Sequence, residues 1–190
     1  RATDRIDGPL KTTGTAPYAY EQNKAAPHAA YGYVVGAAIA KVLPRDGATV
    51  VTVDVPQAGD ALAKVANQVS GTALQLDITR QDAGQVILDH ALSRHGSLDI
   101  VIHNAGITRD KLLVNMDAAK WDSVMAVNIE SQLRMNRVFL AANPPGLRLV
   151  SLASTSGIAG NRGQTNYGAS KAAVMGMVAA TAPLMEPLDG

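Results

Sequence analysis

Short apolar runs alternate with amphipathic stretches along most of this 190-residue chain. Runs such as ATVVTVDV (48–55) and LDIVIHNAGI (98–107) are apolar and bounded by turn-forming residues, which is typical of buried strands. The stretches 56–71 and 81–96 repeat apolar residues at helical spacing. This regular alternation predicts the α/β class, with a doubly wound parallel sheet in a three-layer αβα arrangement.

The same pattern gives the order of the expected elements. We expect strands at 31–35, 48–55, 72–80, 98–107 and 147–154. We expect helices at 37–43, 56–71, 81–96, 109–143 and from Asn166 onward. Because the carboxyl ends of parallel strands meet at one edge of a sheet, a ligand is expected at that edge.

Composition narrows the class of protein. Residues 1–23 are rich in Gly, Pro and Thr, so we expect a tail or linker followed by one domain over 24–190. The 47% of hydrophobic residues indicates a globular protein, and the net charge of +1 favours neither nucleic acid nor an anionic membrane as a partner.

No apolar run approaches the ~20 residues that span a bilayer, and we find no secretory signal pattern, so we expect a cytoplasmic protein. The chain has no cysteine, and its four histidines lack metal-ligand spacing, so we expect no metal site.

The stretch SLASTSGIAGNRGQTNYGASK (151–171) holds the strongest candidate chemistry, a serine followed by a Tyr-x-x-x-Lys motif. Helical spacing places Tyr167 and Lys171 on one face, one turn apart. A phenol there can protonate a carbonyl oxygen as hydride reaches the carbon, and a nearby ammonium favours loss of the phenolic proton. Ser154, at the end of the preceding strand, can hold the same carbonyl oxygen. Together these residues predict carbonyl reduction.

Polar and small residues stand at the carboxyl ends of four predicted strands. They are Asp54, Asp77, the run Asn104, Ala105 and Gly106, and Ser154. Their convergence predicts a nucleotide site at this edge of the sheet. An acidic residue in the position of Asp54 binds the adenosine ribose hydroxyls and repels a 2′-phosphate, so we expect NAD(H) to be favoured over NADP(H).

The glycine-rich turn that should hold the pyrophosphate is incomplete. If Gly36 is the last glycine of the turn, the earlier positions fall on Ala30 and Val34, and the first strand contains Pro27, which a central strand does not tolerate. If YGYVV (31–35) is the first strand, Gly36 opens the turn and several loop residues are missing. We prefer the second placement, because YGYVV has the composition of a buried strand.

These motifs resemble those of the short-chain dehydrogenase/reductase family, from about Tyr31 to the C-terminus. The residues that carry the resemblance are Asn104-Ala105-Gly106, Asn128 in the following helix, Ser154, and Tyr167 with Lys171. The resemblance implies a Rossmann fold that lacks its last strands here, since the family continues well beyond the catalytic helix.

The resemblance also implies residue roles. Tyr167 would be the general acid, Lys171 would assist it and bind the nicotinamide ribose, Ser154 would position the carbonyl, and Asn128 would hold the water of a proton relay. The cofactor would lie against Gly36, Asp54, Asp77, Ile78, Asn104, Ala105, Gly106, Tyr167 and Lys171.

Within the family, NAGITRDKLLVNM and GIAGNRGQTNYGASK are similar to the 3-oxoacyl-[acyl-carrier-protein] reductases, and most similar to the high-molecular-weight actinobacterial form, which favours NADH. This similarity implies NAD(P)H-dependent reduction of a 3-oxoacyl thioester, bound to acyl carrier protein or CoA, in fatty-acid synthesis by a homodimer or homotetramer. The alternatives are a dehydrogenase for another ketone or alcohol, or a scaffold that has lost cofactor binding. The basic residues that the family often uses to dock the carrier are replaced here by Asn143-Pro144-Pro145-Gly146.

Overall fold

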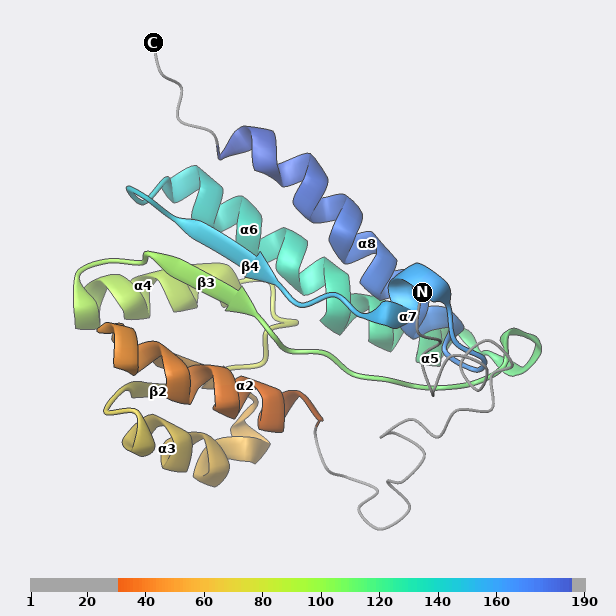
Figure 1. The fold of residues 1–190 in the computed structure, drawn as a ribbon, viewed down its shortest axis with the longest axis horizontal. Helices are drawn as coiled ribbons and strands as arrows, with labels where there is room; N and C mark the ends of the chain where they lie inside the picture. Colours follow the sequence, from red (N-terminus) through yellow and green to blue (C-terminus); the bar gives the residue numbers. More distant parts are fainter. Residues whose placement is uncertain (1–30, 186–190) are drawn as a thin grey trace, which may run out of the picture.

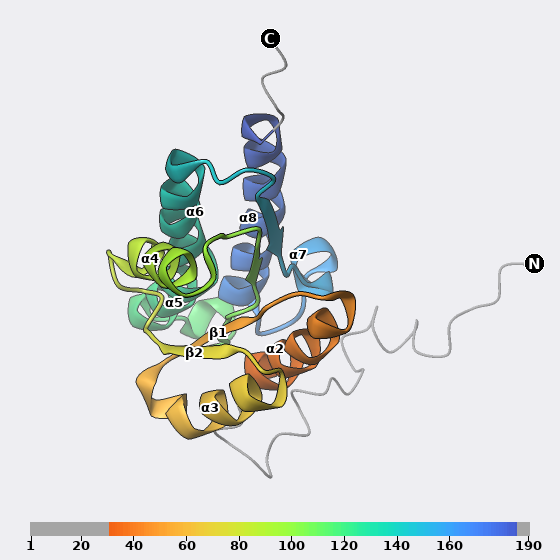
Figure 2. The ribbon, with the colours of Figure 1, turned by 90° about the vertical axis from the view of Figure 1, so that its left-hand side faces the viewer.

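The computed structural model describes residues 31–185, with side chains from Gly36 onward. The predicted tail, 1–23, lies outside the described residues. Helices α2 (Tyr31–Val42) and α3 (Gly59–Gln68) lie on one side of the strands, and α4 (Ala83–His95), α6 (Ser131–Ala142) and α8 (Thr165–Thr181) lie on the other (Figures 1 and 2). Layered packing of helices on parallel strands confirms the predicted α/β class.

The described strands pair in parallel, as expected. They are β1 (Val51–Asp54), β2 (Thr72–Gln75), β3 (Ile100–His103) and β4 (Arg148–Ser151). β1 pairs with β2 from Val51↔Thr72 to Asp54↔Gln75, and β3 pairs with β4 from Ile100↔Arg148 to His103↔Ser151. The described residues therefore form two two-stranded sheets instead of one continuous doubly wound sheet.

The predicted strand at 31–35 is wrong, so these residues do not join the two strand pairs into one sheet. These residues form the first turns of α2, which continues without interruption to Val42. Further along this helix, Ala40 packs with Val50, Val65 and Val69, so the helix and not a strand brings this part of the chain into the core. Gly36 consequently lies inside α2 and does not open a turn.

The main core lies between the strands and helices α4 and α6. Its buried members are Leu76, Ala83, Leu88, Met135 and Phe139, and partly buried residues of all four strands pack against them. A third cluster joins Ile129 to Val174 and Met177 of α8. These contacts hold α8 beside α6, so that the first turns of α8 stand near the carboxyl ends of β3 and β4 (Figure 1).

The long helix predicted over 109–143 starts later than expected and contains a π-helical turn. Helix α5 (Ala118–Met125) begins only after Asp117, whose carboxylate caps it by accepting from the Lys120 amide at 2.8 Å. Residues Ala126–Glu130 then form a π-helical turn before α6 starts. Such turns occur frequently at functional sites, and this one contains Asn128.

Within residues 31–185 no helix is both long and apolar enough to cross a membrane.

Candidate active site

Two strand ends and one helix bring the predicted catalytic residues together. β3 delivers Asn104, Ala105 and Gly106 just beyond its carboxyl end, and β4 delivers Leu152 and then Ser154. Helix α8 lies across these two segments and contributes Tyr167 and Lys171 from its first two turns. The site therefore forms at the carboxyl edge of the β3–β4 pair.

Tyr167 and Lys171 lie one helical turn apart on α8, as their spacing predicts. The Lys171 ammonium nitrogen is 5.9 Å from the centroid of the Tyr167 ring. Lys171 is only 4% exposed, and its Nζ donates to the carbonyl oxygen of Leu152 at 2.7 Å. Burial lowers the pKa of Lys171, because desolvation disfavours the charged form. An ammonium has three donors, and the bond to Leu152 uses one of them.

Asn128 is fully buried in the π-helical turn, and its side-chain amide is used at both ends. Its Oδ1 accepts from the Ile107 amide at 2.8 Å, and its Nδ2 donates to the Ile107 carbonyl at 3.0 Å. The same Nδ2 lies 3.0 Å from Oγ of Ser170 on α8. Asn128 therefore joins the loop after β3 to the helix that carries Tyr167.

Ser170 extends this connection to the predicted general acid. Its hydroxyl accepts from Asn128 and donates to the backbone carbonyl of Tyr167 at 2.8 Å. Ser170 is fully buried, so this pair of hydrogen bonds is shielded from water. The backbone position of Tyr167 is thereby coupled to Asn128.

Ser154 stands at the N-cap of α7 (Thr155–Ala159), where its hydroxyl oxygen accepts from the Ser156 amide at 3.2 Å. Accepting this bond leaves the hydroxyl hydrogen for another acceptor. α7 packs closely on α8, because a Cβ added at Gly157 would lie 2.8 Å from the backbone of Lys171 and Ala172. The missing side chain at Gly157 thus lets the segment that carries Ser154 approach helix α8.

The loop after β3 provides room for a ligand beside the Tyr–Lys pair. A Cβ added at Gly106 would lie 3.4 Å from Oδ1 of Asn128 and 3.6 Å from Nζ of Lys171. Ala105 is exposed. Since glycine and alanine leave the space over Lys171 open, these residues fit the nicotinamide end of a dinucleotide.

Gly36 faces this loop from helix α2. A Cβ added there would lie 2.8 Å from Nδ2 of Asn104, so the absence of a side chain allows α2 and the loop to come close together. The residues before Tyr31, where a phosphate-binding turn would precede the helix, lie outside the described residues.

The residues expected near the adenosine end lie apart from the Tyr–Lys pair, at the ends of β1 and β2. The Asp54 carboxylate accepts from the Val55 amide at 2.8 Å. Asp77 is exposed and accepts from both the amide and the hydroxyl of Thr79, which lowers its pKa. Ile78 packs partly against the main core.

Sequence analysis missed several polar residues of this site. Gln164 donates from Nε2 to Asp110 at 3.0 Å, and its Oε1 accepts from Ser156 and Asn161. These bonds attach the start of α8 to α7 and to the loop after β3. Burial raises the pKa of Asp110.

Two further missed residues are Ser170 and Gln132, and both are almost fully buried. The sequence contains one signal that could have revealed Gln132. Polar residues recur every fourth position at Asn128, Gln132 and Asn136, on a helix whose same side carries core residues.

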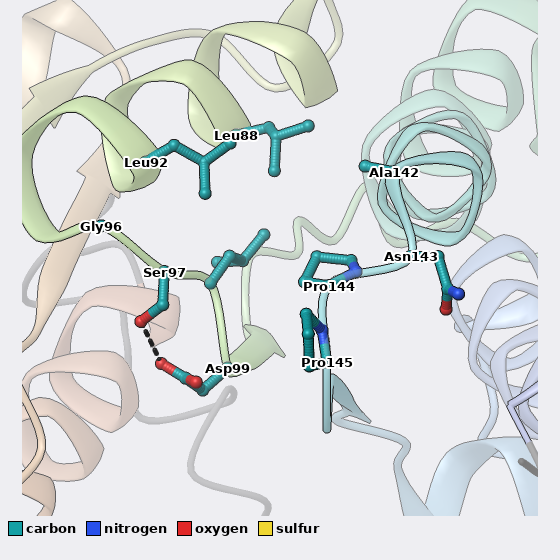
Figure 3. Close-up of a pocket in the computed structure, with 10 residues that line it drawn as sticks. Leu88, Leu92, Gly96, Ser97, Asp99, Ala142, Asn143, Pro144 and Pro145 are labelled. Atoms are coloured by element: carbon teal, nitrogen blue, oxygen red, sulfur yellow. Dashed lines mark hydrogen bonds between the residues drawn. The ribbon is translucent and has the colours of Figure 1, made fainter.

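One pocket lies at the opposite end of the strands, between the carboxyl ends of α4 and α6 (Figure 3). Leu88 and Leu92 face Pro144 and Pro145 across it. None of the residues that line this pocket is basic, and it adjoins the amino ends of β3 and β4, far along the strands from the Tyr–Lys pair. The pocket is therefore separate from the candidate active site.

The chain combines parallel strands, a π-helical turn that contains Asn128, and a helix that carries Tyr167 and Lys171. This combination is typical of oxidoreductases with a dinucleotide-binding fold. A family model described as enoyl-(acyl carrier protein) reductase matches residues 29–188. The chain belongs to this short-chain dehydrogenase/reductase family.

Several curated proteins are similar to the chain. The 3-oxoacyl-[acyl-carrier-protein] reductase of Thermotoga maritima is 35% identical over 75% of this chain and 60% of its own length. The enzyme of the same name from Pseudomonas aeruginosa is 37% identical over 78% of this chain and 62% of its own length. A peroxisomal hydratase-dehydrogenase-epimerase of Neurospora crassa is 36% identical over 80% of this chain and 17% of its own length. The chain thus spans about three-fifths of the bacterial reductases that it matches.

The expected preference for NAD(H) over NADP(H) is wrong, because the matching 3-oxoacyl-[acyl-carrier-protein] reductases are NADPH-dependent. The expectation relied on an acidic residue, Asp54, at a strand end and on the resemblance to a form that favours NADH. Asp54 does end β1, and its carboxylate accepts from the next amide in its own loop. The presence of an acidic residue at this strand end is therefore insufficient to select the cofactor.

Proposed function

We propose that this chain carries the catalytic centre of an NADPH-dependent reductase that converts a 3-oxoacyl thioester to the 3-hydroxyacyl form. One observation carries the proposal: the buried hydrogen-bond chain from Asn128 through Ser170 to Tyr167, beside Lys171. Similarity to the bacterial 3-oxoacyl-[acyl-carrier-protein] reductases supports the choice of substrate class.

Tyr167 acts as the general acid in this proposal. Its phenol donates a proton to the substrate carbonyl oxygen while the carbonyl carbon accepts hydride, so that the ketone becomes a secondary alcohol. The Lys171 ammonium, 5.9 Å from the ring centroid, favours the negative charge that forms on the phenol oxygen. Ser154 donates its hydroxyl hydrogen to the same carbonyl oxygen.

Asn128 keeps this arrangement in place and is the proposed holder of the relay water. Both hydrogens of its side-chain amide are used by Ile107 and Ser170, and its backbone carbonyl accepts from Gln132. A carbonyl oxygen accepts two hydrogen bonds, so the second position at this backbone carbonyl is the proposed site of the water. A proton from this water would pass to Lys171 and from Lys171 to the phenolate oxygen of Tyr167, which becomes a phenol again.

The cofactor supplies the hydride when bound. The residues that would hold its nicotinamide end are Asn104, Ala105, Gly106, Tyr167 and Lys171, and Gly36 would support this loop from α2. Asp54, Asp77 and Ile78 would lie toward its adenosine end.

The carrier of the acyl group is either acyl carrier protein or CoA. The Asn143-Pro144-Pro145-Gly146 segment offers no positive charge to an acidic carrier protein. This segment therefore gives no support for an acidic carrier protein, and a CoA thioester is the second candidate substrate.

We also propose that the protein is a cytoplasmic homodimer or homotetramer. Helix α8 exposes small residues, among them Ala172, Gly176, Ala179 and Ala180, and such a surface permits close helix packing between subunits. Sedimentation of the purified protein tests this assembly, and a monomer at every concentration would contradict it.

The function is tested by NADPH oxidation with 3-oxoacyl thioesters of both carriers and with a simple ketone. Consumption of NADPH with a thioester supports the proposal, and the ratio of the rates identifies the carrier. Turnover of the ketone alone would assign a different dehydrogenase, and failure to bind NADPH by fluorescence titration would favour a non-catalytic scaffold.

A further inference from the structure

Gln132 is a buried polar residue with a position that the proposed catalytic roles do not explain. It lies on α6, one turn after Asn128, and is only 1% exposed. Its Nε2 donates to the backbone carbonyl of Asn128 at 2.8 Å, and its Oε1 accepts from the Ser151 hydroxyl at 2.9 Å. Both ends of the amide are thus used inside the protein.

The orientation of this amide follows from chemistry. The Asn128 carbonyl can only accept a hydrogen bond, so the Gln132 nitrogen must face it. The Gln132 oxygen then faces Ser151, whose hydroxyl can donate. No flipped amide satisfies both partners equally well.

The two hydrogen-bond partners of Gln132 belong to two different segments of the site, the π-helical turn and the end of β4. Asn128 holds Ser170, and Ser170 holds the backbone carbonyl of Tyr167. Ser151 ends β4 and immediately precedes Leu152, whose carbonyl accepts from Lys171. Gln132 is therefore the side chain that joins the Asn128 turn to the strand end of the Tyr–Lys site.

We propose that Gln132 is a positioning residue for the reduction: it sets the distance between the Asn128 turn and the end of β4. This inference rests on the proposed function.

The π-helical turn gives a physical reason for this role. A π turn holds one residue more than an α-helical turn, so relaxation to α geometry would rotate the following side chains by about 100°. Gln132 follows the turn and donates to the Asn128 carbonyl inside it, and this bond opposes that relaxation. Its loss would move Asn128 relative to Ile107 and Ser170 and disturb the proton relay.

Gln132→Met is the first test, because methionine keeps the volume and removes both hydrogen bonds. We expect kcat to fall about 10- to 100-fold, as for an unsatisfied buried polar group, while the KM of the thioester and the Kd of NADPH change less than about threefold. Unchanged kcat in the folded variant would overturn the inference.

Gln132→Glu provides a signature that a purely structural role would not produce. A protonated carboxyl can donate to Asn128 and accept from Ser151, whereas a carboxylate only accepts and repels the Asn128 carbonyl. Burial raises the pKa of such a carboxyl, so kcat of Gln132→Glu relative to the unmodified protein should rise as the pH falls from about 8 to about 6. A constant ratio over this range would contradict the proposal.

The matched control is Asn136→Leu. Asn136 lies one turn further along α6, is 5% exposed, and contacts His103 and Met177. It is a buried polar residue that makes none of the bonds linking Asn128, Ser170 and Tyr167. We expect this variant to lose stability while its kcat stays close to that of the unmodified protein. An equal fall in kcat for both variants would show that loss of any buried amide on α6 suffices, and would overturn the inference.

Hydrogen exchange separates failure of this inference from failure of the proposed function. We expect Gln132→Met, but not Asn136→Leu, to speed amide exchange in 126–131 and 165–171, whatever reaction the protein catalyses. If the unmodified protein reduces no thioester yet shows this exchange pattern, only the proposed function fails. Should Gln132→Met not fold, Ser151→Ala removes one of the two bonds with minimal change in volume, and unchanged exchange and kcat there would contradict the inference.

Discussion

Nζ of Lys171 donates to the backbone carbonyl of Leu152 over 2.7 Å, which attaches helix α8 to the segment that follows β4. The lysine is 4% exposed, so its position is set by this bond and by packing and not by solvent. One side chain thus serves both the arrangement of the site and its electrostatics.

Lys171→Met should lower kcat about 10²- to 10⁴-fold, because it removes both the positive charge beside Tyr167 and the bond to Leu152. Steady-state kinetics with saturating NADPH measures this effect. Lys171→Arg is the control: it keeps the charge, so it should retain more activity than Lys171→Met. Equal activity of the two variants would show that the charge is irrelevant.

Tyr167→Phe should lower kcat by a similar factor of about 10²–10⁴ while leaving the Kd of NADPH nearly unchanged, since only the proton donor is removed. Fluorescence titration measures binding and NADPH oxidation measures turnover. Retention of full activity would refute the assignment of Tyr167 as the general acid.

Gly157→Ala should destabilise the protein by about 1–3 kcal/mol, because the added Cβ would lie 2.8 Å from the backbone of α8. Gly176→Ala is the matched change, since nothing lies within 4 Å of an added Cβ there. This second variant should gain up to about 1 kcal/mol from the higher helix propensity of alanine. Urea unfolding of both variants tests the pair, and equal shifts in the same direction would contradict the expected contact between α7 and α8.

Stability should fall as the pH drops below the ordinary histidine value of 6.5. His103 is buried beside Asn136, and desolvation lowers its pKa in the folded protein. Below pH 6.5 the unfolded chain binds a proton that the folded protein does not, so the free energy of unfolding decreases with falling pH, by at most about 1.4 kcal/mol per pH unit for this group. The raised pKa of Asp110 acts in the opposite direction at lower pH.

Urea unfolding at several pH values between about 5 and 7.5 measures this slope. His103→Gln keeps an amide for Asn136 and should reduce the slope. The same substitution at His90 provides the comparison. Burial also lowers the pKa of His90, but His90 lies at a more exposed site than His103. A His103→Gln variant with an unchanged slope would contradict the assignment to His103.

The local hydrophobic and polar pattern was sufficient to predict a strand or helix where only one type of element fitted it. The apolar run before Asp54 forms β1, the run before Asn104 forms β3, and the Tyr-x-x-x-Lys spacing places both side chains on one helix face. These features depend on neighbours within one or two turns, so the sequence alone predicts them.

The sequence misled where two local interpretations competed. YGYVV has the β-branched and aromatic composition of a strand, but it is continuous with the alanine-rich helix that follows and forms its first turns. The error carried over to the expected role of Gly36, because that role depended on where the first turn lies.

The sequence by itself determined the α/β class, the order of most elements and the residues that carry the candidate chemistry. Tertiary structure alone decided the π-helical turn at Asn128, the division into two strand pairs and the roles of Ser170 and Gln132 as connecting side chains. The physical reason is that these features depend on contacts between residues far apart in the sequence, which no local pattern specifies. Ser151 and Gln132 are 19 positions apart, and Asn128 and Ser170 are 42 apart.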